Sequence, residues 1–115
     1  MKISKNSAEH YVWGKICDGW HLVKTAGMSV IHEKMPPDTA EVRHFHQKAR
    51  QFFFVLARQA TLEVDGEVFL LDEHEGIEIA PQVPHQMMNA SAGATEFIVV
   101  SVPTSKGDRV TQPHR

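Results

Sequence analysis

The sequence predicts an all-β domain in which two sheets close into a jelly-roll barrel. Between residues 30 and 102, short apolar runs are interrupted by Gly, Pro or Asp, at intervals of about 8–12 residues that are typical of sandwiches and barrels. Helical periodicity is nearly absent from the same stretch. Because about ten strands in one small domain leave edges that must be hidden, we expect a closed barrel of two packed sheets.

The clearest single element is a hairpin over residues 59–71. Its two apolar runs are separated by Asp65 and Gly66. These residue types tolerate the positive φ angles that a two-residue hairpin turn requires. We therefore expect the two strands to pair directly.

The remaining strands are placed by the same pattern of short apolar runs. Pro36 and Pro37 end one strand, and Pro81 and Pro84 frame a turn before His85, because proline cannot donate to a strand ladder. The expected strands are Tyr11–Ile16, Trp20–Lys24, Met28–Met35, Glu41–His46, Gln51–Leu56, Gly76–Ala80, His85–Asn89 and Thr95–Val102.

The two ends of the chain are expected to lie outside the core barrel. Aromatic residues around a predicted turn at Cys17–Gly19 indicate an added N-terminal hairpin. This hairpin either reaches a partner subunit and lines the pocket mouth, or merely completes the sandwich. Residues 103–115 are polar and have no period, so we expect them to extend over the surface.

Length and composition exclude several classes of protein. A chain of 115 residues fits one domain, here residues 1–115 with the barrel over about 28–102. Its net charge of −2, without charge blocks, gives no footprint for nucleic acid or an anionic membrane. A single cysteine, Cys17, and the lack of an apolar leader predict a cytoplasmic protein.

The eight histidines are the unusual part of the composition. His44 and His46 stand two residues apart, so on a strand both face the same side. Gln51 is the polar exception in an otherwise apolar strand, and His85 follows the proline turn. Three imidazoles brought together favour a metal site, whereas the alternative is three ordinary hydrogen-bonded core histidines. The other five are expected at the surface: His10, His21, His32, His74 and His114.

These segments resemble the two motifs of the cupin superfamily over residues 28–102. The first is His44-Phe45-His46 with Gln51 and the later Gly66, and the second runs from Gly76 through Pro84, His85 and Asn89. The resemblance implies a double-stranded β-helix, often a homodimer, with a divalent metal bound by His44, His46, Gln51 and His85. Gln51 stands where the family usually has glutamate, and it would either bind the ion or orient a ligand.

The glutamine makes this set similar to small cupins that ketonise unsaturated uronic acids. The resemblance therefore implies metal-assisted isomerisation, ketonisation or lyase chemistry on a small sugar acid or keto acid. A non-catalytic module that binds a small molecule or a metal, and an iron-dependent dioxygenase, are the alternatives. Neutral ligands leave the charge of the ion uncompensated, and this donor set suits Mn, Fe, Co, Ni or Zn.

Strand alternation predicts which side chains line the pocket. Val42 is expected to face inward with His44 and His46, while Arg43 and Phe45 face outward. On the preceding strand we expect Glu33 inward between Ile31 and Met35, with His32 and Lys34 in solvent. Glu33 is then the candidate general base; alternatively it is a surface residue or pairs with Lys34 or Arg43.

Overall fold

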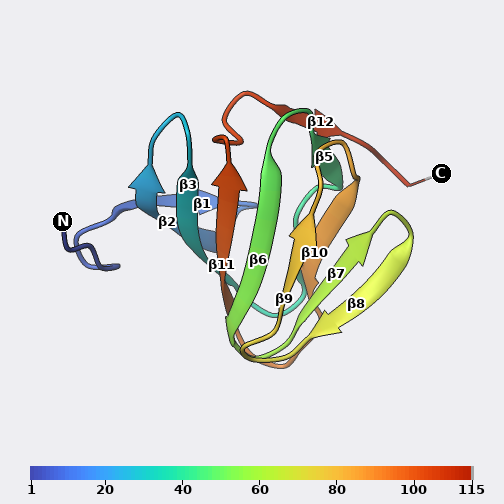
Figure 1. The fold of residues 1–115 in the computed structure, drawn as a ribbon. Coiled ribbons are helices and arrows are strands. Elements are labelled where there is room, and N and C mark those ends of the chain that lie inside the picture. The colour runs from blue at the N-terminus through green and yellow to red at the C-terminus, as the bar shows by residue number, and fades with distance from the viewer. Residues whose placement is uncertain (115) are drawn as a thin grey trace.

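Every regular element of the computed structural model, which describes residues 1–114, is a β-strand, as predicted (Figure 1). Among these residues no helix is long and apolar enough to cross a membrane. The strands are β1 (Glu9–Trp13), β2 (Cys17–Lys24), β3 (Ser29–Met35), β4 (Thr39–Ala40), β5 (His44–His46), β6 (Arg50–Ala57), β7 (Ala60–Val64), β8 (Glu67–Leu71), β9 (Gly76–Ile79), β10 (His85–Asn89), β11 (Thr95–Val102) and β12 (Arg109–Thr111).

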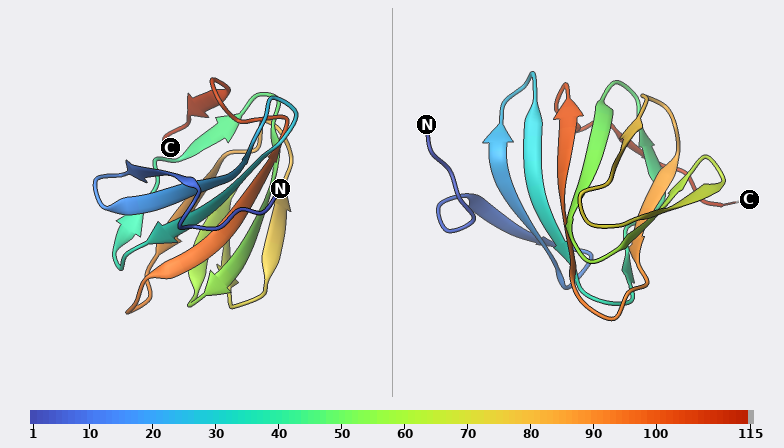
Figure 2. Two further views of the ribbon diagram at one scale, coloured as in Figure 1. Left: turned by 90° about the vertical axis from the view of Figure 1, so that its left-hand side faces the viewer. Right: turned by 60° about the horizontal axis from the view of Figure 1, so that its bottom comes forward.

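The strands form two antiparallel sheets that face each other (Figure 2). Sheet I has the order β1-β2-β3-β11-β6-β9, and sheet II has the order β12-β5-β10-β7-β8 with β4 added beside β10. Neighbours in space are far apart in sequence, such as β3 beside β11 and β5 beside β10. This crossed connectivity is that of a jelly roll, so the predicted fold class is confirmed.

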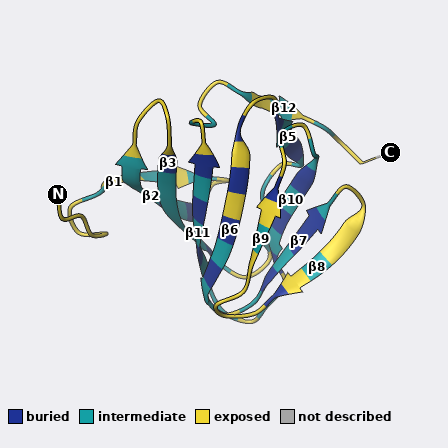
Figure 3. Ribbon diagram, viewed as in Figure 1, coloured by how far each residue is buried: buried dark blue, intermediate teal, exposed yellow. Residues whose placement is uncertain are grey.

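The core lies between the two sheets because side chains alternate across each strand. Along β6, Gln51, Phe53 and Val55 are buried while Phe52 is exposed, and along β10 His85, Met87 and Asn89 are buried (Figure 3). This alternation directs both Gln51 and His85 into the space between the sheets. Apolar side chains fill one end of the interior, and polar ones gather at the other.

The predicted hairpin is present as β7 and β8. Their strands pair from Ala60 opposite Leu71 to Val64 opposite Glu67. Asp65 and Gly66 have φ angles of 49° and 93°, the left-handed pair that a tight hairpin turn requires. Gln82, in the turn before His85, also has a positive φ of 70°.

The N-terminal hairpin is present, but its predicted turn is wrong. The turn lies at residues 14–16, and Cys17–Gly19 instead begins β2. Gly14 and Lys15 both have positive φ angles, of 56° and 79°. Glycine adopts a positive φ at low cost, so Gly14 suits this turn. Cys17, which was expected in the turn, is instead fully buried in the core.

One prediction of side-chain direction is also wrong. Val42 is 59% exposed, because the expected strand Glu41–His46 is interrupted at residues 41–43 and its alternation begins only at His44. His32 and Lys34 alternate with Glu33 along β3 as predicted, but they are half-buried and do not lie fully in solvent. His32 Nε2 lies 2.8 Å from Glu96 Oε1, and its ring meets Trp20 edge-on.

The C-terminal segment does not simply extend over the surface. Within it, β12 pairs with β5 and places Arg109 opposite His46 and Thr111 opposite His44. Arg115, the last residue of the predicted tail, lies outside the described residues. This segment therefore adds a strand directly beside the one that carries two of the candidate metal ligands.

Candidate metal centre

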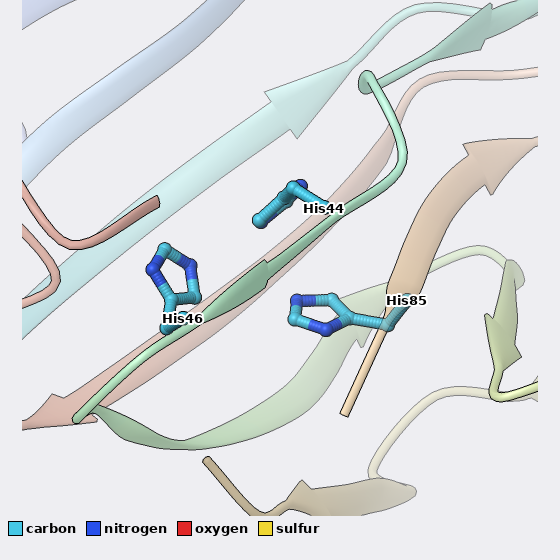
Figure 4. Close-up of side chains that lie close together, drawn as sticks. All are labelled: His44, His46 and His85. Carbon is cyan, nitrogen blue, oxygen red and sulfur yellow. The ribbon is translucent and has the colours of Figure 1, made fainter. Parts of the chain in front are cut away.

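The structure brings His44, His46 and His85 together on the inner face of sheet II. His44 and His46 come from β5, and His85 lies directly opposite His44 on β10. Their ring centroids are 4.6 Å (His44–His85), 4.9 Å (His44–His46) and 6.0 Å (His46–His85) apart. One nitrogen from each ring lies within 4.8 Å of the others, and the rings surround one small space (Figure 4).

Two of the rings are oriented by backbone carbonyls. Nδ1 of His44 is 2.7 Å from the Val42 carbonyl oxygen, and Nδ1 of His85 is 3.0 Å from that of Val83. A carbonyl only accepts hydrogen bonds, so both Nδ1 atoms carry the proton and both Nε2 atoms keep a lone pair. Burial lowers the pKa of His44 to about 3 and that of His46 to about 4, and it also lowers the pKa of His85. All three rings are neutral at pH 7.

Gln51 reaches the same region from sheet I. Its Nε2 donates a hydrogen bond to Ser101 Oγ at 2.9 Å, while its Oε1 is buried without a partner among residues 1–114. The same holds for Nε2 of His85. Buried polar atoms are normally satisfied, so these two atoms are available to bind an ion or a polar ligand. Imidazole nitrogens with one amide oxygen fit a divalent transition-metal ion.

A cavity of about 290 Å³ opens beside the histidines, between the two sheets. Its walls are mixed: apolar side chains from sheet I lie beside charged and polar ones from both sheets and from both ends of the chain. It is lined by Tyr11, Ile31, Glu33, Glu41, His44, His46, Gln51, Phe53, Val99, Ser101, Ser105, Gly107 and Arg109. This volume suits a small metabolite.

Two carboxyl groups face this cavity. Glu33 points inward as predicted, and its only hydrogen bond among residues 1–114 comes from Tyr11 Oη at 3.3 Å. It pairs with neither Lys34 nor Arg43, since Arg43 binds Glu63 instead. Burial, assisted by the charge of Glu41, raises the pKa of Glu33 to about 8. Burial likewise raises the pKa of Glu41 to about 7, although Glu41 Oε2 accepts a hydrogen bond from the Met87 amide at 2.8 Å.

Arg109 supplies the positive charge of the cavity. It is an exposed residue, and one guanidinium nitrogen donates to the Val42 carbonyl at 3.1 Å. Within residues 1–114 it forms no ion pair at 4.0 Å or less. A planar guanidinium with free N–H groups is suited to binding a carboxylate in a bidentate manner.

Tyr11 enters the cavity because Gly19, opposite it on β2, has no side chain. A Cβ atom built at Gly19 would lie 2.2 Å from Tyr11 Cζ. The N-terminal hairpin therefore lines the pocket with this phenol. Burial is the main cause that raises the pKa of Tyr11 far above its usual value, and the charge of Glu33 and the hydrogen bond to it act in the same direction.

Tyr11 is the only tyrosine of the chain, so its ionisation can be followed by phenolate absorbance. We expect no phenolate at pH about 10, where an ordinary tyrosine is half ionised. Glu33→Gln removes the charge and should lower the pKa of Tyr11, and Gly19→Ala should lower it further by displacing the ring into solvent. The unfolded protein, as the control, should titrate near pH 10. A normal titration in the folded wild type would contradict this position of Tyr11.

Several residues of the cavity were not predicted from the sequence. Glu41 and Arg109 were missed because each lies in a segment whose predicted conformation was wrong. Ser101 was missed because only the pairing of β6 with β11 places it opposite Gln51. Asn89, the last residue of the second motif, donates to the carbonyls of Met35 and Gly93, both at 2.8 Å.

Comparisons with known proteins agree with this architecture. The family model of the cupin domain matches residues 31–101. A search of curated proteins finds no significant match. Similar solved structures include the polyketide cyclase RemF from Streptomyces resistomycificus (15% identity, TM-score 0.84, 100% of this chain and 87% of that one). KdgF from Halomonas sp. is 13% identical, with a TM-score of 0.81 over 88% of this chain and 91% of that one.

A third similar structure is described as a sugar phosphate isomerase, from Silicibacter pomeroyi. It is 18% identical, with a TM-score of 0.80 over 90% of this chain and 76% of that one. At these identities the likeness concerns the fold alone.

Proposed function

Because this chain belongs to the cupin-domain family, we propose that it is a metal-dependent enzyme that moves a proton within a small sugar acid or keto acid. The reaction class is isomerisation, ketonisation or elimination. The observation that carries the proposal is a half-buried carboxyl group, Glu33, which lines the same cavity as His44 and His46 and has no ion-pair partner among residues 1–114. A general base must present a carboxylate oxygen to the substrate; Tyr11 binds Oε1 of Glu33, and Oε2 accepts no hydrogen bond among residues 1–114.

The donor set supports the proposed place of the ion. His44, His46 and His85 would hold it through imidazole nitrogens, with Gln51 Oε1 as the fourth donor. When bound, a divalent ion polarises a carbonyl or hydroxyl oxygen of the substrate. All four protein donors are neutral, so no protein carboxylate among them reduces the charge of the ion.

The remaining residues of the cavity have separate tasks. Arg109 would bind the carboxylate of the substrate at the mouth. Glu33 would take a proton from a carbon next to the polarised group and return it at the neighbouring atom. Tyr11 holds the carboxyl group of Glu33 in place by its hydrogen bond. Ile31, Phe53 and Val99 provide apolar walls, which reduce the access of water to the reacting atoms.

The metal content of the purified protein tests the first half of the proposal. The protein is loaded separately with Mn, Fe(II), Co, Ni and Zn, then analysed for metal. We expect about one ion per chain, as for a mononuclear site, in the wild type and in His74→Ala, whose histidine is exposed and far from the cluster in sequence. We expect none in His44→Ala. A well-folded wild type that takes up no ion under loading conditions would contradict the proposal.

A substrate screen tests the second half. The loaded protein is incubated with uronates and keto acids, with and without oxygen. Conversion of one of these acids that is equal in both conditions supports proton transfer. Conversion that requires oxygen would instead assign iron-dependent oxygen chemistry. Tight binding of an acid without any conversion would show a binding module.

A further inference from the structure

Asp108 connects the C-terminal segment to the turn that follows His46. Its Oδ1 accepts hydrogen bonds from the backbone amides of Gln47 at 2.7 Å and Lys48 at 3.0 Å. Its Oδ2 accepts from the amides of Lys48 at 3.2 Å and Ala49 at 2.9 Å. These three residues lie between His46 and Gln51 in the chain. One carboxylate thus fixes the backbone between two members of the candidate site.

The strand that follows Asp108 reinforces this connection. Arg109 pairs with His46 across β12 and β5, and the Gln47 amide donates to the Asp108 carbonyl at 3.1 Å. The family model ends at residue 101, so this contribution comes from a segment outside the matched domain. Strand β12, which is short and has little apolar surface, is held chiefly by its backbone hydrogen bonds to β5 and by the carboxylate of Asp108.

His46 differs from the other two histidines in how its ring is oriented. His44 and His85 each direct Nδ1 at a backbone carbonyl. Among residues 1–114, Nδ1 of His46 is buried without a hydrogen-bond partner, and the nearest carboxylate oxygen is Asp108 Oδ2 at 4.0 Å. Metal-binding histidines usually direct their second ring nitrogen at a carboxylate or a carbonyl, which fixes the tautomer.

We propose that Asp108 is a positioning residue for His46: its carboxylate keeps the ring proton on Nδ1 and leaves the Nε2 lone pair free for the histidine cluster. At 4.0 Å the two atoms do not form a hydrogen bond, so the preference arises from attraction between the carboxylate charge and the Nδ1–H dipole. The amides of Lys48 and Ala49 hold Oδ2 at this position. The role in metal binding rests on the proposed function, whereas the tautomer of His46 does not.

The tautomer of His46 is measured by nitrogen-15 NMR on the metal-free, full-length protein. We expect wild-type His46 to carry its proton on Nδ1. In Asp108→Asn one acceptor oxygen is retained for the turn, but the charge is lost and an NH2 donor replaces the other oxygen. His46 should then shift to a mixture or to the Nε2–H form. Glu75→Gln is the matched control, because Glu75 also accepts a backbone hydrogen bond, from Asp72, in a turn on another part of the chain.

Affinity for Co²⁺ and the visible spectrum of bound Co²⁺ provide the second readout. Loss of a group that orients a ligand typically weakens metal affinity by about 10- to 100-fold. We expect this loss in Asp108→Asn, with an altered cobalt spectrum, and unchanged values in Glu75→Gln. An affinity loss that accompanies the change of tautomer supports the positioning role.

Two results would overturn the inference. If wild-type His46 carries its proton on Nε2, Asp108 does not set the tautomer, whether or not the variant folds. If Asp108→Asn weakens cobalt binding while the His46 tautomer is unchanged, Asp108 acts only by holding the turn. A wild type that binds no ion at all contradicts the proposed function, but the NMR comparison still decides the role of Asp108.

Discussion

Saturating Co²⁺ is expected to raise the midpoint of thermal unfolding of the wild type by roughly 10 °C, and His85→Ala should abolish this increase. An ion that binds only the folded state stabilises it by RT ln(1 + [L]/Kd), about 2.7 kcal/mol at 100 times Kd. For a domain of this size each kcal/mol corresponds to several degrees. His85 is 1% exposed and provides an unpartnered nitrogen to the cluster, so its removal leaves an incomplete donor set.

The measurement compares each variant with and without Co²⁺. This removes the intrinsic effect of the substitution on folding. His74→Ala is the matched control, because His74 is exposed. The ring of His74 stacks on that of Phe54, with 6.3 Å between the ring centroids. This variant should keep the full increase. Equal stabilisation of His85→Ala and the wild type would show that Co²⁺ binds elsewhere.

The shared direction of His44 and His46, and the need of Gln51 for a polar partner, could be predicted from the sequence because they depend on local geometry. Two histidines two residues apart must share a face of a strand, and a lone glutamine in an apolar strand must find a polar partner. The structure brings the three histidines together and leaves Gln51 Oε1 unpartnered. Their convergence depends on His85 lying opposite His44. That pairing crosses about forty residues of chain, so it came from the motif resemblance and not from alternation.

Other parts of the site could not be predicted for a physical reason. Strand alternation holds only where the strand is continuous, and the chain leaves strand geometry at residues 41–43. This break exposes Val42 and places Glu41 in the cavity. A pattern of polarity alone gives no sign of such a break. The inward orientation of Glu33 could be predicted because β3 is continuous and pairs with β11 along its whole length.

The C-terminal segment illustrates a second cause. Strand β12 contains only three residues, and just one of them, Val110, is apolar. A strand this short has no measurable period. What holds it is the ladder with β5 and the contacts of Asp108 with the turn after His46. These are long-range backbone interactions, so Arg109 and Asp108 acquire their positions from the fold and not from a local signal.

Replacing Glu33 by glutamine is expected to lower kcat by about 10²- to 10⁴-fold, the usual contribution of a general acid or base. Glutamine keeps the size of the side chain and can still accept the hydrogen bond from Tyr11, but it cannot accept a proton. The substitution is tested on the acid that the screen identifies, with the same metal load in both proteins. Glu78→Gln is the control, because Glu78 is an exposed carboxylate that pairs with Arg50 on the surface.

Proton transfer is separated from substrate binding by comparing, for each variant, the change in kcat with the change in KM. Arg109→Gln removes the cation that would hold the substrate carboxylate, so it should raise KM more than it lowers kcat. Glu33→Gln should do the reverse, and it should also slow exchange of the substrate C–H proton with deuterated solvent. Unchanged turnover in Glu33→Gln would exclude Glu33 as the base. In that case Glu41, the other half-buried carboxyl group of the cavity, is the residue that the same geometry would assign to proton transfer.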